Sequence, residues 1–169
     1  MSEEQVLESQ IRAGKYLTFK LGNEEYGIVI MKVKTIIGLM EITRVPRTPH
    51  FVRGVINLRG QIIPIVDMRK KFAMEEIEDT RETTIIVVEV NKEDSIQEIG
   101  IVVDSVSEVM DIEEENVDDT PEFGSEFDTE FIMGMAKAKG RVISLLSIEK
   151  ILSSDEVVSL SALQNSATT

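Results

Sequence analysis

The feature of the sequence that most constrains the fold is an internal repeat. A pattern of one glycine followed by spaced aliphatic residues runs from residue 27 to residue 36 and recurs from residue 100 to residue 109. A second pattern, G-x5-G-Q-I-I beginning at Gly54, recurs as G-x5-G-R-V-I beginning at Gly134. The same order in both copies predicts that one small structural unit occurs twice. The second pair of matches is spaced further apart than the first, and a longer acidic loop in the second copy accounts for the difference.

Each copy has the composition of short β-strands. Residues 16–21, 84–90 and 142–146 are rich in β-branched and aliphatic side chains, and such runs favour strands. These features predict a mostly β protein built from two tandem small barrels of about five strands each. We place the first barrel at residues 15–80 and the second at residues 81–152, with a polar tail at 1–14 and a C-terminal helix and tail at 153–169.

Several single residues predict local structure within this repeat. Glycines at equivalent positions are expected to allow a positive φ or a tight bend where a barrel turns a corner; they are Gly27, Gly60, Gly100 and Gly140. Asp67 and Ser147 each precede a short segment, MRKKF or IEKIL, and are predicted to cap a short helix. Pro64 interrupts an apolar run and has no N–H to donate, so its strand is expected at a sheet edge or with a bulge at that point.

The charge and composition exclude several classes of function. The chain has 18 Lys and Arg against 31 Asp and Glu, a formal net charge of −13, which repels both nucleic-acid phosphates and an anionic membrane face. No apolar run approaches the roughly 20 residues that span a bilayer. The N-terminal segment MSEEQVLESQ lacks the basic-then-apolar order of a signal peptide, and there are no cysteines. We therefore expect a cytoplasmic protein that binds no nucleic acid and does not insert into the membrane.

The candidates for catalytic or metal chemistry are weak. His50 is the single histidine, so we interpret it as a surface residue rather than a catalytic group or a metal ligand. Residues 53–60 resemble a phosphate loop only in their glycine spacing, since they lack the G-x-x-x-x-G-K-[ST] order. The acidic segment 111–119 has Asn116 where a calcium loop needs glycine, which favours a solvated loop. The sequence predicts no enzyme, no cofactor and no metal site.

A known family is similar to this chain over residues 15–152. The block RGVINLRGQIIPIVD at residues 53–67 is its most specific part, and the segments EYGI at 25–28, GIVVDSV at 100–106 and PEF at 121–123 support it. These motifs closely resemble the CheW family of chemotaxis adaptors. The resemblance implies two five-stranded barrels of SH3-like or OB-like form. It also implies a non-catalytic scaffold that couples transmembrane chemoreceptors to the histidine kinase CheA.

The resemblance also implies two contact surfaces. A groove between the barrels would receive the helical tip of a chemoreceptor, and the residues carried over to that groove are Val33, Thr35, Gly54, Arg59, Thr84 and Val106. Glu122 and Phe123 would contact the regulatory domain of CheA, or other CheW-like domains in a ring assembly. Thr35 departs from the family, because many members have a glutamate there that pairs with the arginine of the NLRG turn. Thr35 leaves only a neutral hydrogen bond for Arg59, and a charge-assisted bond is about twice as strong.

Two other classes of function fit the sequence less well. An oligonucleotide-binding barrel needs a basic groove with stacking aromatic side chains, whereas this chain is acidic, has 5% aromatic residues and has no tryptophan. A small hydrolase needs a nucleophile, a base and a group that orients the base, and no serine lies in a G-x-S-x-G pattern. Both are disfavoured relative to an interaction module.

Overall fold

The computed structural model describes residues 12–92, 95–119 and 131–152, and strands make up most of these ranges. The elements in chain order are β1 (Gly14–Leu21), β2 (Glu24–Val29), η1 (Ile30–Lys32), β3 (Val33–Gly38), β4 (Val52–Leu58), β5 (Gln61–Asp67), α2 (Met68–Lys71), β6 (Thr84–Lys92), β7 (Ser95–Val103), β8 (Ser105–Ile112), η2 (Glu114–Asn116), β9 (Val117–Asp118), β10 (Ile132–Ala138), β11 (Arg141–Leu146) and α3 (Ile148–Ile151). The elements η1 and η2 are single turns of 3-10 helix.

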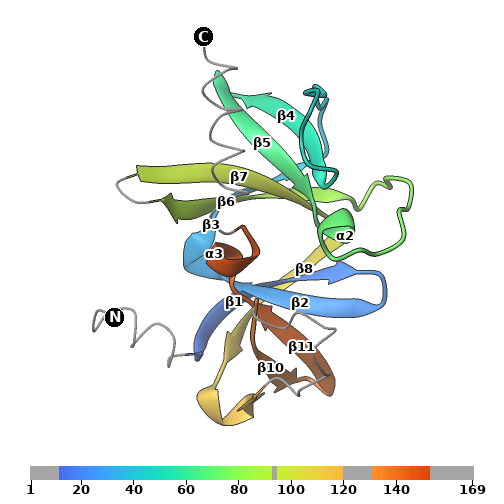
Figure 1. Ribbon diagram of the computed structural model, residues 1–169. Helices are drawn as coiled ribbons and strands as arrows, with labels where there is room; N and C mark the ends of the chain where they lie inside the picture. Colours follow the sequence, from blue (N-terminus) through green and yellow to red (C-terminus); the bar gives the residue numbers. More distant parts are fainter. Residues whose placement is uncertain (1–11, 93–94, 120–130, 153–169) are drawn as a thin grey trace.

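The strands form two curved sheets, one above the other in Figure 1. The upper sheet has five strands in the order β3-β6-β7-β5-β4, and the lower sheet has six in the order β8-β1-β2-β11-β10-β9. This architecture confirms the predicted fold class, mostly β with two small units. The lower sheet exceeds the expected five strands by β9, which is two residues long.

The two sheets do not correspond to the two halves of the sequence, which corrects the predicted barrel boundary at residues 80 and 81. β1 and β2 pair with β8 and β11 in the lower sheet, whereas β6 and β7 pair with β3 and β5 in the upper sheet. Each sheet therefore joins the first two strands of one repeat to the later strands of the other. Two parallel pairs, β2 with β11 and β5 with β7, make this exchange.

The repeated glycines have two different roles. Gly60 and Gly140 have φ of +86° and +74° and lie in the equivalent hairpin turns β4–β5 and β10–β11, as predicted. Gly27 and Gly100 instead lie inside strands opposite Leu145 and Ile65 in the parallel pairs, so the expectation that they bend a corner is wrong. A Cβ on Gly100 would lie 2.5 Å from the Cδ1 atom of Ile65, so the absence of a side chain lets the sheet close there.

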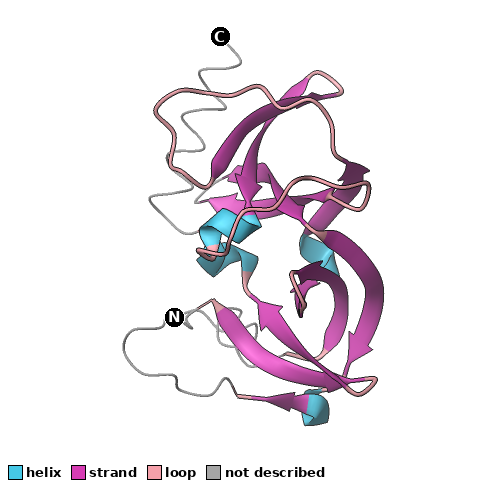
Figure 2. Ribbon diagram, turned by 90° about the vertical axis from the view of Figure 1, so that its right-hand side faces the viewer, coloured by secondary structure: helices cyan, strands magenta, loops and turns pink. Residues whose placement is uncertain are grey.

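The apolar side chains form three clusters, because the central strands are buried on both faces. Ile85 and Val87 of β6 point into the interior of the upper sheet, and Ile86 and Val88 point into a larger core between the two sheets. A third cluster around Tyr16 fills the lower sheet. The short helices lie at the level between the sheets (Figure 2), where Met68 of α2 and Ile148 and Ile151 of α3 join the central core. The central core therefore fixes the two sheets against each other.

The predictions for the two caps agree with the structure, whereas the prediction for Pro64 is wrong: β5 lies inside the upper sheet between β7 and β4, and the register shift lies between Val52 and Gly54 of β4. The side chain of Asp67 accepts a hydrogen bond from the backbone N–H of Lys70, and Ser147 accepts one from Lys150, so both residues cap their helices. Pro64 lies opposite Val55, whose backbone N–H and C=O both bond to Thr43 on the far side. No backbone group of Val55 therefore needs the N–H that Pro64 lacks. On the other side of the strand, the pairing of β5 with β7 begins only at Ile65.

Candidate interaction groove

A groove of about 490 Å³ lies where strands of the upper sheet meet strands of the lower sheet. We call it the inter-sheet groove; its lining residues are Lys20 of β1, Ile36 of β3, Arg81 and Glu82 before β6, Thr84 of β6, and Ser105, Val106 and Ser107 of β8. Its walls thus combine two apolar side chains with hydroxyl groups and with charges of both signs. The hydroxyl of Thr84 donates to the backbone carbonyl of Glu82 at 2.7 Å, which holds the segment leading into β6.

Three of the expected groove residues lie on the strands that form this region. Thr84 and Val106 line the groove itself. Val33 and Val106 occupy the same position of the repeat: Val33 lies opposite Val88 at the start of β3, and Val106 lies opposite Phe19 at the start of β8. Both valines are partly buried and pack against the core between the sheets. The repeat thus places one valine of each sheet, Val33 of β3 and Val106 of β8, against the core between the two sheets.

Ile36 is a groove residue that the sequence reasoning missed. It is 42% exposed and lines the groove, whereas its neighbour Ile37 packs into the interior of the upper sheet. Side chains alternate along a strand, so Thr35 shares the face of Ile37 and does not line the groove. The alternation of residues 33–38 was the signal that could have identified Ile36.

The remaining two expected groove residues lie on the β4–β5 hairpin, which projects away from the lower sheet (Figure 1). Gly54 is buried, with φ of +143°, and a Cβ there would lie 2.1 Å from the carbonyl oxygen of Thr43. Its role is to let the backbone of β4 approach the bridge between Thr43 and Val55. Arg59 is exposed at the hairpin turn with φ of 55°. Among the described residues no hydrogen bond or ion pair holds its guanidinium. Glu122 and Phe123 lie outside the described residues.

The acidic segment around residues 111–119 is more structured than the expected solvated loop. Glu114 begins the η2 turn, and its carboxylate accepts bonds from Nε and Nη2 of Arg12 at 3.1 and 2.8 Å. Arg12 also pairs with Asp119 at 2.9 Å, and this environment raises the pKa of the guanidinium. A hydrogen bond to Glu115 raises the pKa of the Glu113 carboxyl. Arg12 therefore neutralises part of the segment, and the fold includes residues assigned to the N-terminal tail.

One further interaction fixes the two sheets at the junction. Asp104 follows β7 and accepts hydrogen bonds from Nε and Nη2 of Arg69, which lies in α2. The same carboxylate accepts a bond from the backbone N–H of Gly22 in the β1–β2 turn at 2.7 Å. The guanidinium of Arg69 lowers the pKa of Asp104 below its usual value. One carboxylate thus ties a turn of the lower sheet to the upper sheet.

Within the three described ranges, no group of three or more His, Asp or Glu side chains is placed to hold a metal ion. His50 is exposed and contacts Phe51 edge-on, with the ring centroids 5.7 Å apart. None of the described helices is both long and apolar enough to cross a bilayer.

Comparison with known proteins gives the family. The family model for the CheW-like domain matches residues 15–156. The chain is 43% identical to the chemotaxis protein CheW of Klebsiella aerogenes over 143 residues, which cover 85% of this chain and 84% of the relative. It is 34% identical to CheW of Rhizobium meliloti, over 83% of this chain and 88% of the relative.

A solved structure agrees with this result. The crystal structure of the scaffolding protein TtCheW from Thermoanaerobacter tengcongensis matches with a TM-score of 0.75 and 33% identity, and the match covers 85% of this chain and 95% of that one. The sequence motifs, the two exchanged sheets and these matches agree on one assignment. The chain is a non-catalytic member of the CheW-like family of chemotaxis scaffolding proteins.

Proposed function

We propose that this chain couples transmembrane chemoreceptors to the histidine kinase CheA as a cytoplasmic adaptor recruited to receptor arrays. The observation that carries the proposal is the inter-sheet groove, which opens between the two sheets and has Ile36, Thr84 and Val106 in its walls. A helical receptor tip presents apolar side chains flanked by polar ones. The groove offers the complementary surface, two aliphatic side chains with serine and threonine hydroxyls around them.

The kinase contact in this proposal uses other residues of the sequence. The resemblance assigns it to Glu122 and Phe123, in the connection between β9 and β10, and assigns ring assembly with other CheW-like domains to the same region. Two separate surfaces would let one chain hold a receptor and the regulatory domain of CheA at once. Such a bridge needs no chemistry of its own, in keeping with a non-catalytic scaffold.

The experiment that tests the proposal is reconstitution with chemoreceptor vesicles and CheA. We expect the chain to sediment with the vesicles, to recruit CheA to them, and to raise kinase activity only when receptors are present. Ile36→Glu places a charge in the groove at a residue that is already 42% exposed, so the variant is expected to fold and to lose vesicle binding.

The matched control is Val142→Glu. Val142 of β11 is 60% exposed and does not line the groove, so this variant carries the same added charge at a different surface. Equal vesicle binding by both variants, or failure of the unmodified chain to recover either receptors or CheA, would contradict the proposal.

A further inference from the structure

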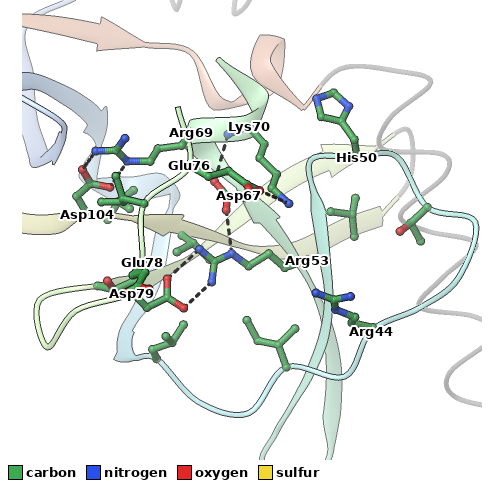
Figure 3. A pocket seen from close by; sticks show the side chains of 18 of the residues that line it. Arg44, His50, Arg53, Asp67, Arg69, Lys70, Glu76, Glu78, Asp79 and Asp104 are labelled. Atoms are coloured by element: carbon green, nitrogen blue, oxygen red, sulfur yellow. Dashed lines mark hydrogen bonds and ion pairs between the residues drawn. The ribbon is translucent and has the colours of Figure 1, made fainter. Parts of the chain in front are cut away.

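A hollow of about 790 Å³ lies beside the β3–β4 connection, and its charges are largely paired with one another. Its ion pairs join Arg53 to Asp67 and Asp79, Arg69 to Asp104, and Lys70 to Glu76 (Figure 3). Because its own carboxylates already bind most of its cations, the charge pattern of this hollow gives little basis for choosing a partner.

The inter-sheet groove differs, because its charged side chains have no partners. Its lining includes Lys20, Arg81 and Glu82, and among the described residues no hydrogen bond or ion pair involves their ammonium, guanidinium or carboxylate groups. On the lower sheet, by contrast, Lys139 and Arg141 pair with carboxylates at 2.5 and 2.9 Å. The groove therefore carries two unpaired positive charges and one unpaired negative charge, in a chain with a formal net charge of −13.

The segment that carries Arg81 and Glu82 is held in place without the use of their side chains. The backbone N–H of Thr80 donates to the hydroxyl of Thr83 at 2.8 Å, and the backbone N–H of Glu82 donates to the hydroxyl of Thr80 at 3.1 Å. Thr83 is buried and anchors the segment in the fold. The two charged side chains are therefore free to bind a partner, and their backbone is already ordered.

Lys20 belongs to the other sheet. It lies opposite Ser105 in the pairing of β1 with β8, and its backbone carbonyl accepts a hydrogen bond from the N–H of Asp104 at 3.1 Å. The two sheets thus each contribute one unpaired cation to the groove, Lys20 from the lower sheet and Arg81 from the segment that leads into the upper one. An occupant that touches both sheets meets both positive charges.

We infer that Lys20, Arg81 and Glu82 determine which helical segments bind in the groove; this rests on the proposed adaptor function, which places a helical segment there. The preferred segment carries two carboxylates and one cationic side chain beside its apolar face. The carboxylates pair with Lys20 and Arg81, and the cation pairs with Glu82. The apolar side chains cover Ile36 and Val106. A segment with the inverted charges brings like charges together, which lowers its affinity.

These three charged residues are not among those that the family resemblance assigns to the receptor contact. Of the polar side chains in that set, Thr84 lines the groove, whereas Thr35 and Arg59 do not. The charge selectivity of the groove therefore depends on residues that the resemblance does not supply.

The test uses the complete chain and two helical peptides that differ only in charge, AALEALAKALEALA and AALKALAEALKALA. Each is labelled with tetramethylrhodamine and amidated, and each places four leucines on one face of a helix with the three charges beside them. Fluorescence anisotropy measures binding at physiological ionic strength, where the Debye length is about 8 Å and local charges dominate. The overall charge of −13 favours the inverted peptide, so a preference for the first peptide must come from the groove.

We expect the first peptide to bind at least about tenfold more tightly than the inverted one. An exposed ion pair changes affinity by roughly twofold to fivefold, and in the inverted peptide all three pairs are replaced by like-charge contacts. Lys20→Gln and Arg81→Gln are each expected to weaken binding of the first peptide about twofold to fivefold. The double variant Lys20→Glu/Arg81→Glu is expected to reverse the preference, which a purely structural role of these residues would not do.

The matched control is Arg47→Gln. Arg47 is exposed and does not line the groove, so its loss removes the same charge at a different surface and is expected to leave the affinity for both peptides unchanged. Ile36→Glu is expected to weaken binding of both peptides, which places them in the groove. Urea unfolding of each variant checks that the fold is unchanged.

Three results would overturn the inference. They are equal binding of the two peptides or tighter binding of the inverted one, dissociation constants above about 1 mM for both, and an effect of Arg47→Gln as large as that of Lys20→Gln. The receptor-vesicle experiment separates this inference from the adaptor function. Vesicle binding that Ile36→Glu abolishes, without a preference between the peptides, rejects only the charge selection. A clear preference between the peptides, without vesicle binding, rejects only the receptor as the partner.

Discussion

At the scale of single residues, the two equivalent hairpin turns allow the effect of backbone strain on stability to be separated from the effect of side-chain packing, because each turn has a glycine with positive φ. Gly60 and Gly140 have positive φ, yet no atom lies within 4 Å of a Cβ built on either. Valine at these positions would therefore be strained by its backbone conformation alone. We expect Gly60→Val and Gly140→Val each to lower the free energy of unfolding by about 1–3 kcal/mol, measured by urea denaturation.

The control for these two variants is Gly38→Val. A Cβ on Gly38 also meets nothing within 4 Å, but its φ is not positive. This variant is expected to stay within about 0.5 kcal/mol of the unmodified chain. If Gly38→Val lowers the free energy of unfolding as much as Gly60→Val does, the added side-chain volume and not the positive φ is the cause of the destabilisation.

Arg59 tests function separately from stability. Its side chain is exposed and unpaired among the described residues, so Arg59→Ala should change the free energy of unfolding by less than about 0.5 kcal/mol. The family resemblance assigns Arg59 to the receptor contact, although it does not line the inter-sheet groove. Under the proposed adaptor function we expect Arg59→Ala to weaken receptor-dependent CheA activation, because an interface arginine can contribute about 2 kcal/mol to binding.

Lys139 supplies the comparison for Arg59, since it occupies the same turn position of the second repeat with φ of 52°. Lys139→Ala should leave receptor-dependent activation unchanged. Full receptor-dependent activation of CheA by Arg59→Ala would show that the NLRG turn has only a structural role.

The sequence predicted the conformation of single residues well where that conformation depends on neighbouring residues in the chain. The caps at Asp67 and Ser147 and the positive φ of Gly60 and Gly140 all follow from chemistry within a few residues. Gly27 and Gly100 were misread because their role depends on strands far away in the sequence. Ile36 was missed because a family resemblance carries residues over one by one and does not follow the alternation of the strand.

At the scale of elements, the junction between the sheets depends on Asp104. Its carboxylate receives Arg69 of α2 and the backbone N–H of Gly22. Asp104→Asn removes the charge and leaves Arg69 without a carboxylate partner. We expect the free energy of unfolding at neutral pH to fall by about 1–3 kcal/mol.

The pH dependence of this effect has a definite sign. The pKa of Asp104 is lowered in the folded protein from the ordinary value of 3.8. Its contribution is therefore complete above that value and is lost as the pH falls through the folded-state pKa. Urea melts should show a difference between the two proteins at pH 7 that shrinks steadily below pH 3.8. A difference that stays constant down to the acid end would contradict the assignment.

At the scale of the whole molecule, the repeat predicted two similar units but not their exchange. The composition of β6 and β7 predicts strands, whereas nothing within either strand specifies that β5 will pair with β7 in parallel. Parallel pairs need a long connection and depend on packing of the complete chain. The candidate groove could be predicted only in part for the same reason, since it lies at the junction of strands from both halves.

The exchange leads to a test with two fragments. Residues 1–80 and 81–169 correspond to the predicted tandem barrels, and tandem barrels would fold separately. Because each sheet takes strands from both halves, we expect each fragment alone to lack cooperative unfolding in circular dichroism. Mixing them at equal concentration should restore the cooperative transition. Cooperative unfolding of either isolated fragment would show that its own strands suffice.

The parallel pair β2–β11 also sets a delay during synthesis. β2 ends at Val29, and its partner β11 ends at Leu146, so most of the chain must be made before the lower sheet can close. Adding roughly 120 residues at roughly 5–20 residues per second takes about 6–24 s. Throughout that interval the β1–β2 hairpin exposes an unpaired, hydrophobic strand edge. During this interval chaperones can therefore bind the nascent chain. The exposed strand edge can also pair with a strand of a neighbouring copy that is being translated from the same mRNA.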